Sequence, residues 1–217
     1  MSEIYHISGL EHSHGGRLVL NVESLTVSGG EIAGITGPNG SGKSTLMAVM
    51  AFLLKPDLGR VRFLGRAVDF AEPSLRRQAV LLPQDPCLLR RTVWGNVSYG
   101  LSVRGLKDEG LVRRAMDMVG LDPQRFAKRW WWELSGGEIR RVGLAARLAL
   151  SPEALLLDEP TANLDPESAR LVRLAILAEV SGQQSAAVVI SHDQQWLESF
   201  VTVLYRLDPD QGLKTLY

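Results

Sequence analysis

Apolar runs and amphipathic patterns alternate along the chain. Residues 17–27, "RLVLNVESLTV", alternate apolar and polar positions as a half-buried strand does, and residues 31–37, "EIAGITG", predict a buried strand running into a glycine turn. The next segment, "KSTLMAVMAFLL", predicts a helix that ends near Lys55-Pro56, because proline disfavours helix in the residue before it. Two further strand regions are expected, a strand pair joined by a turn in "GRVRFLGRAV" (59–68) and a core strand in "QAVLLPQ" (78–84).

The pattern becomes helical between residues 86 and 150. Three helices are expected there, in "TVWGNVSYGL", "DEGLVRRAMDMVGL" and "GGEIRRVGLAARLAL". Strand signals return in "ALLLDE" (154–159) and "AAVVISH" (186–192), separated by the helical pattern "PESARLVRLAILAEV". The alternation of buried strand and helix predicts an α/β fold with a mainly parallel sheet covered on both faces, and residues 86–150 form a helical insertion.

Length and composition restrict the class of protein. A chain of 217 residues corresponds to one or two domains and buries roughly 70% of the surface of the unfolded chain. The single cysteine, Cys87, excludes an intramolecular disulfide and favours a reducing compartment. The first residues lack the basic start and apolar run of a secretory signal, and no apolar stretch approaches the ~18 residues of a membrane span. We therefore expect a soluble protein.

The net charge is zero, but the charges are unevenly distributed. Lys plus Arg and Asp plus Glu both number 24, which argues against an obligate nucleic-acid binder. Residues 87–150 hold twelve Lys or Arg against six Asp or Glu, an excess of six positive charges. This region is either a solvated face or a contact with an anionic partner or membrane surface.

A strong motif for phosphate binding follows the strand at 31–37. Gly37-x4-Gly42-Lys43-Ser44 lies between a predicted strand and a predicted helix, the context in which this motif cradles phosphates. The glycines let backbone N–H groups turn inward, and the helix start adds about half a positive charge. Lys43 is expected to reach the β and γ phosphates, and the Ser44 hydroxyl to bind Mg²⁺. The alternative is a glycine-rich turn that binds nothing. The residues expected to bind the nucleotide are Gly37, Pro38, Asn39, Gly40, Ser41, Gly42, Lys43, Ser44 and Thr45.

Two carboxylates end the leucine-rich strand "LLLDEP". Ligands of open α/β sheets lie beyond the carboxyl ends of the strands, so Asp158 and Glu159 are well placed. Neighbouring residues at a strand end point to opposite sides, which predicts Asp158 toward Mg²⁺ and Glu159 toward the attacking water. An isolated Asp-Glu pair would more often be a helix cap or a surface pair. The phosphate motif upstream favours the catalytic interpretation.

Single polar residues end two other core strands. Gln84 follows "AVLLP", and His192 follows "AAVVIS". Taken singly, each is more often a loop residue than a ligand. Both are predicted to sense the γ-phosphate or the water, because the strands that they end should lie beside those bearing Lys43 and Asp158.

The motifs, taken in order, resemble those of the nucleotide-binding subunit of an ABC transporter. The set comprises "GPNGSGKST", Gln84, "LSGGE" (134–138), "LLLDEP", "NLD" (163–165) and His192, and the resemblance covers essentially the whole chain. It implies one ATPase domain with a P-loop NTPase core, residues 1–85 and 151–217. This core carries an N-terminal antiparallel β part, and residues 86–150 form a helical subdomain. The resemblance also implies ATP with Mg²⁺ as cofactors, catalysis by Glu159, His192 and Gln84, and metal contacts from Ser44, Gln84 and Asp158.

The resemblance gives a reason for a second glycine-rich helix start. Such subunits form head-to-tail dimers in which one chain's signature caps the ATP held by the other chain. The resemblance thus assigns contacts with the partner's ATP to Ser135, Gly136, Gly137 and Asp165. Consistent with this, Ser135-Gly136-Gly137 opens a helix but has no adjacent lysine to hold a triphosphate unaided. The other implied partners are integral membrane permease subunits, at the cytoplasmic face of the membrane, and an extracytoplasmic solute-binding protein, with no nucleic acid.

Several positions depart from the usual family pattern. The aromatic residue that stacks on adenine is replaced by His14, and Glu138 stands where many members have glutamine. Residues 130–132 are three consecutive tryptophans, which cannot all face one core, so at least one should be exposed. Either they pack mostly inside the helical insertion or they form a docking surface for the membrane subunit.

The transported solute is less constrained. "RRTVWGNVSYGLSVRG" is most similar to importers of small oxyanions, particularly the tungstate type. The alternatives are a metal-ion or vitamin importer and an ATPase of the lipoprotein-release or cell-division type. A soluble DNA-repair ATPase is disfavoured, because it would need a long coiled-coil insertion.

Overall fold

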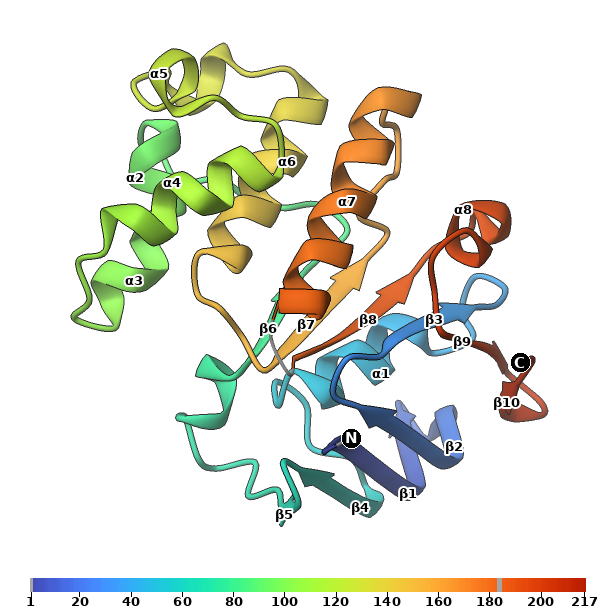
Figure 1. Ribbon diagram of the computed structural model, residues 1–217. Helices are drawn as coiled ribbons and strands as arrows, with labels where there is room; N and C mark the ends of the chain where they lie inside the picture. The colour runs from blue at the N-terminus through green and yellow to red at the C-terminus, as the bar shows by residue number, and fades with distance from the viewer. Residues whose placement is uncertain (1, 183–184) are drawn as a thin grey trace. The chain divides into compact units, whose positions relative to one another are not determined.

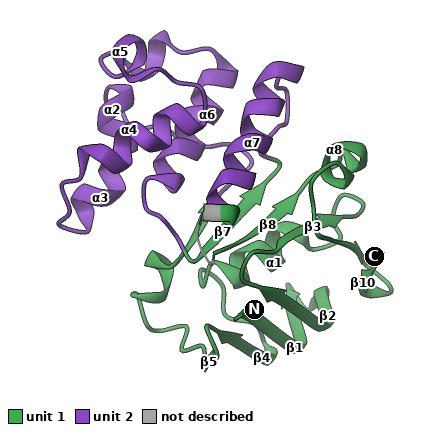
Figure 2. Cartoon of the chain, viewed as in Figure 1, with its two compact units in different colours: residues 1–81, 153–159, 180–217 green, residues 82–152, 160–179 purple. Residues whose placement is uncertain are grey.

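The computed structural model describes residues 2–182 and 185–217. The chain forms two compact units, coloured separately in Figure 2. The first contains the described residues within 1–81, 153–159 and 180–217, and the second contains residues 82–152 and 160–179.

A four-stranded antiparallel sheet lies in the first unit. Its order is β2-β1-β4-β5, with β1 at Glu3–His14, β2 at Arg17–Ser28, β4 at Leu58–Phe63 and β5 at Arg66–Ala67. The predicted strands at 17–27 and 59–68 are confirmed, whereas β1 was not predicted. Its register on β2 shifts between Glu3 and Tyr5 and again between His12 and Ser13, which interrupts the alternation that marks a strand in sequence.

The second sheet of this unit is mainly parallel, as predicted. Its order is β10-β9-β3-β8-β7-β6, seen in Figure 1. The pairs β3–β8, β3–β9 and β7–β8 are parallel, and β10 closes the edge as an antiparallel hairpin with β9. Every residue of β3, β7 and β8 is buried, the pattern of strands covered on both faces. The strands are β3 (Ile32–Thr36), β6 (Ala79–Leu82), β7 (Ala154–Asp158), β8 (Ala186–Ile190), β9 (Val203–Asp208) and β10 (Gly212–Thr215).

Helix α1, Lys43–Met50, follows β3 and is shorter than expected. The prediction that it continues to Lys55-Pro56 is wrong, because Phe52 takes a left-handed φ of 58°. The Phe52 ring packs against Phe63, with 5.1 Å between ring centroids, and the Tyr5 hydroxyl donates to the Met50 carbonyl at 2.7 Å. Packing on the antiparallel sheet therefore ends the helix before the proline does.

The second unit is helical over most of its length. The helix predicted in "TVWGNVSYGL" is two short helices, α2 and α3, and Gly95 and Gly100 are poor helix formers in this segment. The helices of this unit are α2 (Val93–Val97), α3 (Tyr99–Val103), α4 (Glu109–Met118), α5 (Pro123–Phe126) and α6 (Gly136–Leu148), and α7 (Pro166–Gly182) lies almost wholly within it. The second unit also contains a 3-10 turn at Trp131–Glu133. The remaining described helical elements belong to the first unit and are the 3-10 turn Leu75–Arg77 and helix α8, Gln194–Glu198.

None of the described helices combines the length and the apolar character needed to cross a membrane.

Candidate functional site

The loop between β3 and α1, residues 37–42, has the backbone of an anion cradle. Gly42 is the N-cap of α1 with a left-handed φ of 92°, no side chain caps the helix, and its first turn holds no acidic residue. A Cβ on Gly42 would meet the Val19 carbonyl oxygen at 2.3 Å, and one on Gly37 would meet the Leu207 carbonyl oxygen at 2.2 Å. Both positions therefore require glycine. The helix N–H groups are left to bind an anion.

Lys43 lies at the start of α1 and is buried. Its Nζ donates to the carbonyl oxygens of Gly37 and Pro38, both at 2.8 Å, so two of its three donors fix the ammonium over the loop. Burial lowers the pKa of Lys43, while the charges of Glu159 and Asp158 act in the opposite direction. Lys43 and the two carboxylates are thus electrostatic neighbours, as a site for a phosphate and a metal requires.

Asp158 and Glu159 lie where β7 ends. Asp158 pairs with Ile190 of β8, and the Glu159 N–H donates to the Ile190 carbonyl at 3.0 Å, which extends the ladder by one residue. Both side chains are buried. Glu159 has a left-handed φ of 49°, so it leaves the extended conformation on which the alternating directions of the two side chains were predicted. The assignment of separate roles stays a prediction.

His192 follows β8 and faces Glu159. Its Nε2 lies 3.5 Å from Glu159 Oε1, and the His192 side chain is 55% exposed against 9% for Glu159. Burial raises the pKa of Glu159, and Asp158 adds to the rise, whereas the His192 backbone and ring and Lys43 lower it. A buried carboxylate with a raised pKa, beside an exposed imidazole, is typical of a general base.

The outer part of the loop is open to solvent. Pro38, Asn39, Gly40 and Ser44 are exposed, whereas Ser41 is buried, and no described group hydrogen-bonds to its hydroxyl. Thr45 is half-buried.

A magnesium ion fits the donors present. The Ser44 hydroxyl and the Asp158 carboxylate are hard oxygen ligands, which Mg²⁺ prefers. No cluster of three or more His, Cys, Asp or Glu that could hold a metal occurs among residues 2–182 and 185–217. A cation here would therefore share its coordination with phosphate oxygens and water, as Mg²⁺ does when bound to nucleotides.

Ser135 begins α6 in the second unit as its N-cap. Its Oγ accepts from the Glu138 N–H at 3.3 Å, and the Glu138 carboxylate accepts from the Ser135 N–H at 2.7 Å, a reciprocal capping box. Because Oγ accepts within the box, its own proton is available to donate to an anion beyond the helix end. Gly136 has open space where a Cβ would stand, and a Cβ on Gly137 would touch Leu164 at 3.4 Å.

Asp165 and Gln84 also belong to the second unit. Asp165 Oδ1 accepts from the Ser168 N–H at 2.9 Å at the start of α7, and hydrogen bonds from Ser168 lower the pKa of Asp165. Gln84 is exposed, and its carbonyl accepts from the Arg140 guanidinium. Their contacts with ATP stay predictions. So does adenine stacking by His14, which is exposed at the end of β1 and pairs with Arg17.

The three tryptophans precede α6 and are largely exposed. Trp130 and Trp132 are 43% and 61% exposed and stack with their centroids 4.8 Å apart, and Trp131 is half-buried with its ring edge-on to Trp132. The prediction that at least one is exposed is confirmed.

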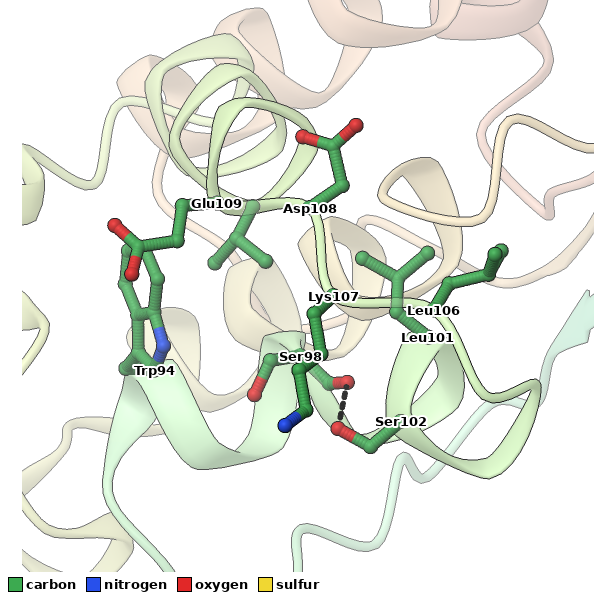
Figure 3. A pocket seen from close by; sticks show the side chains of 9 residues that line it. Trp94, Ser98, Leu101, Ser102, Leu106, Lys107, Asp108 and Glu109 are labelled. Atoms are coloured by element: carbon green, nitrogen blue, oxygen red, sulfur yellow. Dashed lines mark hydrogen bonds between the residues drawn. The ribbon is translucent and has the colours of Figure 1, made fainter.

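A separate cavity of about 260 Å³ lies within the helical unit (Figure 3). Its apolar lining comes from residues such as Trp94, Leu101 and Val112, and the Ser102 hydroxyl donates to the Ser98 carbonyl at 3.0 Å on its wall. None of the predicted site residues lines it. The phosphate cradle and the cavity are therefore different features.

The family model described as "ABC transporter" matches residues 20–162. The tungstate uptake system ATP-binding protein TupC of Peptoclostridium acidaminophilum is 36% identical over 187 residues, which is 86% of each chain. The Fe(3+) ions import ATP-binding protein FbpC of Yersinia pestis is 37% identical over 202 residues. That match covers 91% of this chain but only 57% of FbpC.

Solved structures share the fold over nearly the whole chain. The dimeric bacterial ABC transporter cassette MJ0796 has a TM-score of 0.86 at 25% identity and covers 99% of both chains. CbiO1 of Clostridium perfringens, part of the ABC transporter complex cbiONQ, has a TM-score of 0.85 at 26% identity. It covers 95% of this chain and 85% of its own.

Proposed function

Because the chain belongs to the ABC transporter family and is an ATP-hydrolysing subunit of that family, we propose that two copies bind two ATP molecules head to tail and drive import of a tungstate-like oxyanion. One observation carries the ATPase part of this proposal: Lys43, Asp158, Glu159 and His192 meet at the ends of three neighbouring strands. No two of these strands are joined by a short turn, so only the fold brings the four side chains together.

The cradle holds the triphosphate of ATP. The backbone N–H groups of residues 39–45, which include the start of α1, face the phosphates, and the Lys43 ammonium neutralises the β and γ groups. Ser44 and Asp158 would hold Mg²⁺, which would neutralise phosphate charge. Gln84 is proposed as a further contact of the metal and the water.

Glu159 is the general base for hydrolysis. It orients a water molecule and accepts a proton as the water oxygen bonds to the γ-phosphorus and the bond to the β–γ bridging oxygen breaks. The His192 ring lies 3.5 Å from this carboxylate and contacts the γ-phosphate. Phosphate and ADP are the products.

The helix start at Ser135 completes the site of the partner subunit. The Ser135 hydroxyl, the N–H groups of Gly136 and Gly137, and Asp165 approach the γ-phosphate held by the other chain. ATP then favours the closed dimer, and loss of the γ-phosphate reopens it. The permease bound at the cytoplasmic face converts this cycle into transport, and an extracytoplasmic binding protein delivers the solute.

The similarity to the tungstate uptake protein supports an oxyanion as the solute. That match also covers a larger share of the relative's length than the matches to the Fe(3+) import proteins do. A metal-ion or vitamin importer and a lipoprotein-release or cell-division ATPase are the alternatives.

The test uses the subunit with its permease and binding protein in proteoliposomes. We expect tungstate to stimulate ATP hydrolysis and accumulate inside, and Glu159→Gln to abolish both. Stimulation by Fe³⁺ and not by tungstate would assign the chain to metal import. Hydrolysis without any solute response would favour the mechanical ATPases.

A further inference from the structure

Arg129 links α6 to the segment that precedes it. Its Nη1 donates to Glu138 Oε1 at 3.0 Å, its Nη2 donates to the Glu133 carbonyl, and its guanidinium lies 5.0 Å from the centre of the Phe126 ring. The Arg129 side chain is 33% exposed and the Glu138 side chain 18%. The pair is thus partly shielded from water, where ion pairs are screened less than at an open surface.

The other oxygen of Glu138 holds the helix start. Oε2 accepts from the Ser135 N–H at 2.7 Å, and the Glu138 N–H donates back to Ser135 Oγ. Partial burial alone would raise the pKa of Glu138, but the Ser135 hydrogen bonds and Arg129 lower it. The carboxylate is therefore ionised at neutral pH.

An ionised carboxylate at this place conflicts with the proposed function. Ser135 and the two glycines after it are proposed to approach a γ-phosphate, and Glu138 lies in the same helical turn. The Glu138 carboxylate and the γ-phosphate, both negative, would repel each other there unless a cation neutralises one of them. Arg129 is the guanidinium in contact with Glu138.

We propose that Arg129 is a positioning residue of the signature: it neutralises Glu138 and holds the capping box, so that Ser135 can approach the γ-phosphate of the ATP bound by the partner. This inference rests on the proposed head-to-tail dimer. In this proposal the effect of Arg129 on the nucleotide passes through Glu138.

The test measures ATP-dependent dimerisation by sedimentation in a Glu159→Gln background, which holds ATP unhydrolysed. We expect Arg129→Met to weaken dimerisation about tenfold or more, because an unpaired carboxylate then faces phosphate. Glu138→Gln alone should change dimerisation by less than about threefold, since the amide keeps an acceptor for the Ser135 N–H. The double variant Arg129→Met with Glu138→Gln should recover most of the lost dimerisation, because position 138 no longer carries a charge that needs neutralising. Arg125→Met is the matched control, since the Arg125 guanidinium also lies over the Phe126 ring but forms no ion pair with Glu138 among the described residues.

Three further measurements separate the outcomes. The defect of Arg129→Met relative to the parent should shrink as salt rises from about 0.05 to 0.5 M, because screening weakens the repulsion. Affinity of the monomer for ATP should be unchanged, because each chain binds ATP through its own Lys43. Arg129→Lys, which keeps the charge, should retain dimerisation better than Arg129→Met even if both melt at a lower temperature.

A double variant as weak as Arg129→Met, or a defect that salt does not change, would overturn charge neutralisation by Arg129. If the Glu159→Gln parent itself fails to dimerise with ATP, the head-to-tail proposal fails instead. The two failures are therefore distinguishable.

Discussion

At the scale of the residue, Glu159 combines strain with burial. A left-handed conformation costs a non-glycine residue about 1 kcal/mol or more, and burial of its carboxylate adds a desolvation penalty. The hydrogen bond from its N–H to Ile190 holds the backbone in this conformation. Such costs at one residue are expected where function, and not stability, sets the geometry.

The pH dependence of hydrolysis should report the raised pKa of Glu159. In the proposed mechanism the ionised carboxylate is the active form, so kcat/KM should fall as the pH drops through a pKa that lies above the ordinary glutamate range. The His192 ring lowers this pKa, so His192→Ala should move the acid limb to higher pH in addition to slowing hydrolysis. His6→Ala, at a histidine paired with Glu3 on β1, is the control and should leave the limb in place. An acid limb that moves to lower pH in His192→Ala would contradict the assigned electrostatics.

The tryptophans should differ in what they contribute to stability. Trp132 is 61% exposed and mainly stacks on Trp130. Trp132→Ala should therefore lower the free energy of unfolding by about 1 kcal/mol and Tm by roughly 2–4 °C. Trp131 is half-buried, and Trp131→Ala should cost at least about twice as much. Thermal unfolding measures both, and a larger loss at Trp132 would contradict this order.

Docking of the exposed indoles on the membrane subunit stays a prediction. Trp132→Ala should weaken co-purification with the permease, while the Tm of the isolated subunit falls by no more than the roughly 2–4 °C expected from the lost stacking. Unchanged co-purification would leave the stacked pair without a docking role.

At the scale of the element, the turn from β3 into α1 depends on glycine for steric reasons. Gly37→Ala would bring a Cβ within 2.2 Å of the Leu207 carbonyl, so the loop must shift. We expect a loss of about 1–3 kcal/mol in unfolding free energy and at least tenfold weaker ATP binding. Gly16→Ala is the control: its φ is 79°, but no atom lies within 4 Å of the added Cβ, so only backbone strain should appear and ATP binding should not change.

At the scale of the whole molecule, two chains should complement one another. In the proposed dimer, Lys43→Ala disables phosphate binding by the chain's own loop, and Ser135→Arg disables the contact with the partner's ATP, so each homodimer has a lesion in both sites. In a mixed dimer both lesions fall in one site and leave the other intact. We expect mixing to restore ATP-dependent association, measured by sedimentation, with partial hydrolysis.

Dilution of the wild type gives a second check on the assembly. A site shared between chains forms only when two chains associate, so the specific activity should fall as dimers dissociate. Full activity per chain in a demonstrated monomer would exclude the shared site.

The sequence by itself determined the features that depend on local geometry. The cradle at residues 37–45, the carboxylates at the end of β7 and the helix start at Ser135 each arise within a few neighbouring residues, where glycine conformations, strand ends and capping side chains act directly. The mainly parallel sheet also followed from the order of buried strands and helices.

Only the tertiary structure decided the features that depend on residues far apart in the chain. Insertion of β8 between β3 and β7 places His192 against Glu159, the Tyr5, Phe52 and Phe63 rings end α1 early, and strand β1 with its shifted register gave no clear pattern. Arg129 was missed because an isolated arginine has no sequence signal until folding sets it against Glu138. Periodicity and spacing describe the chain along its own axis, whereas these contacts arise from packing between segments.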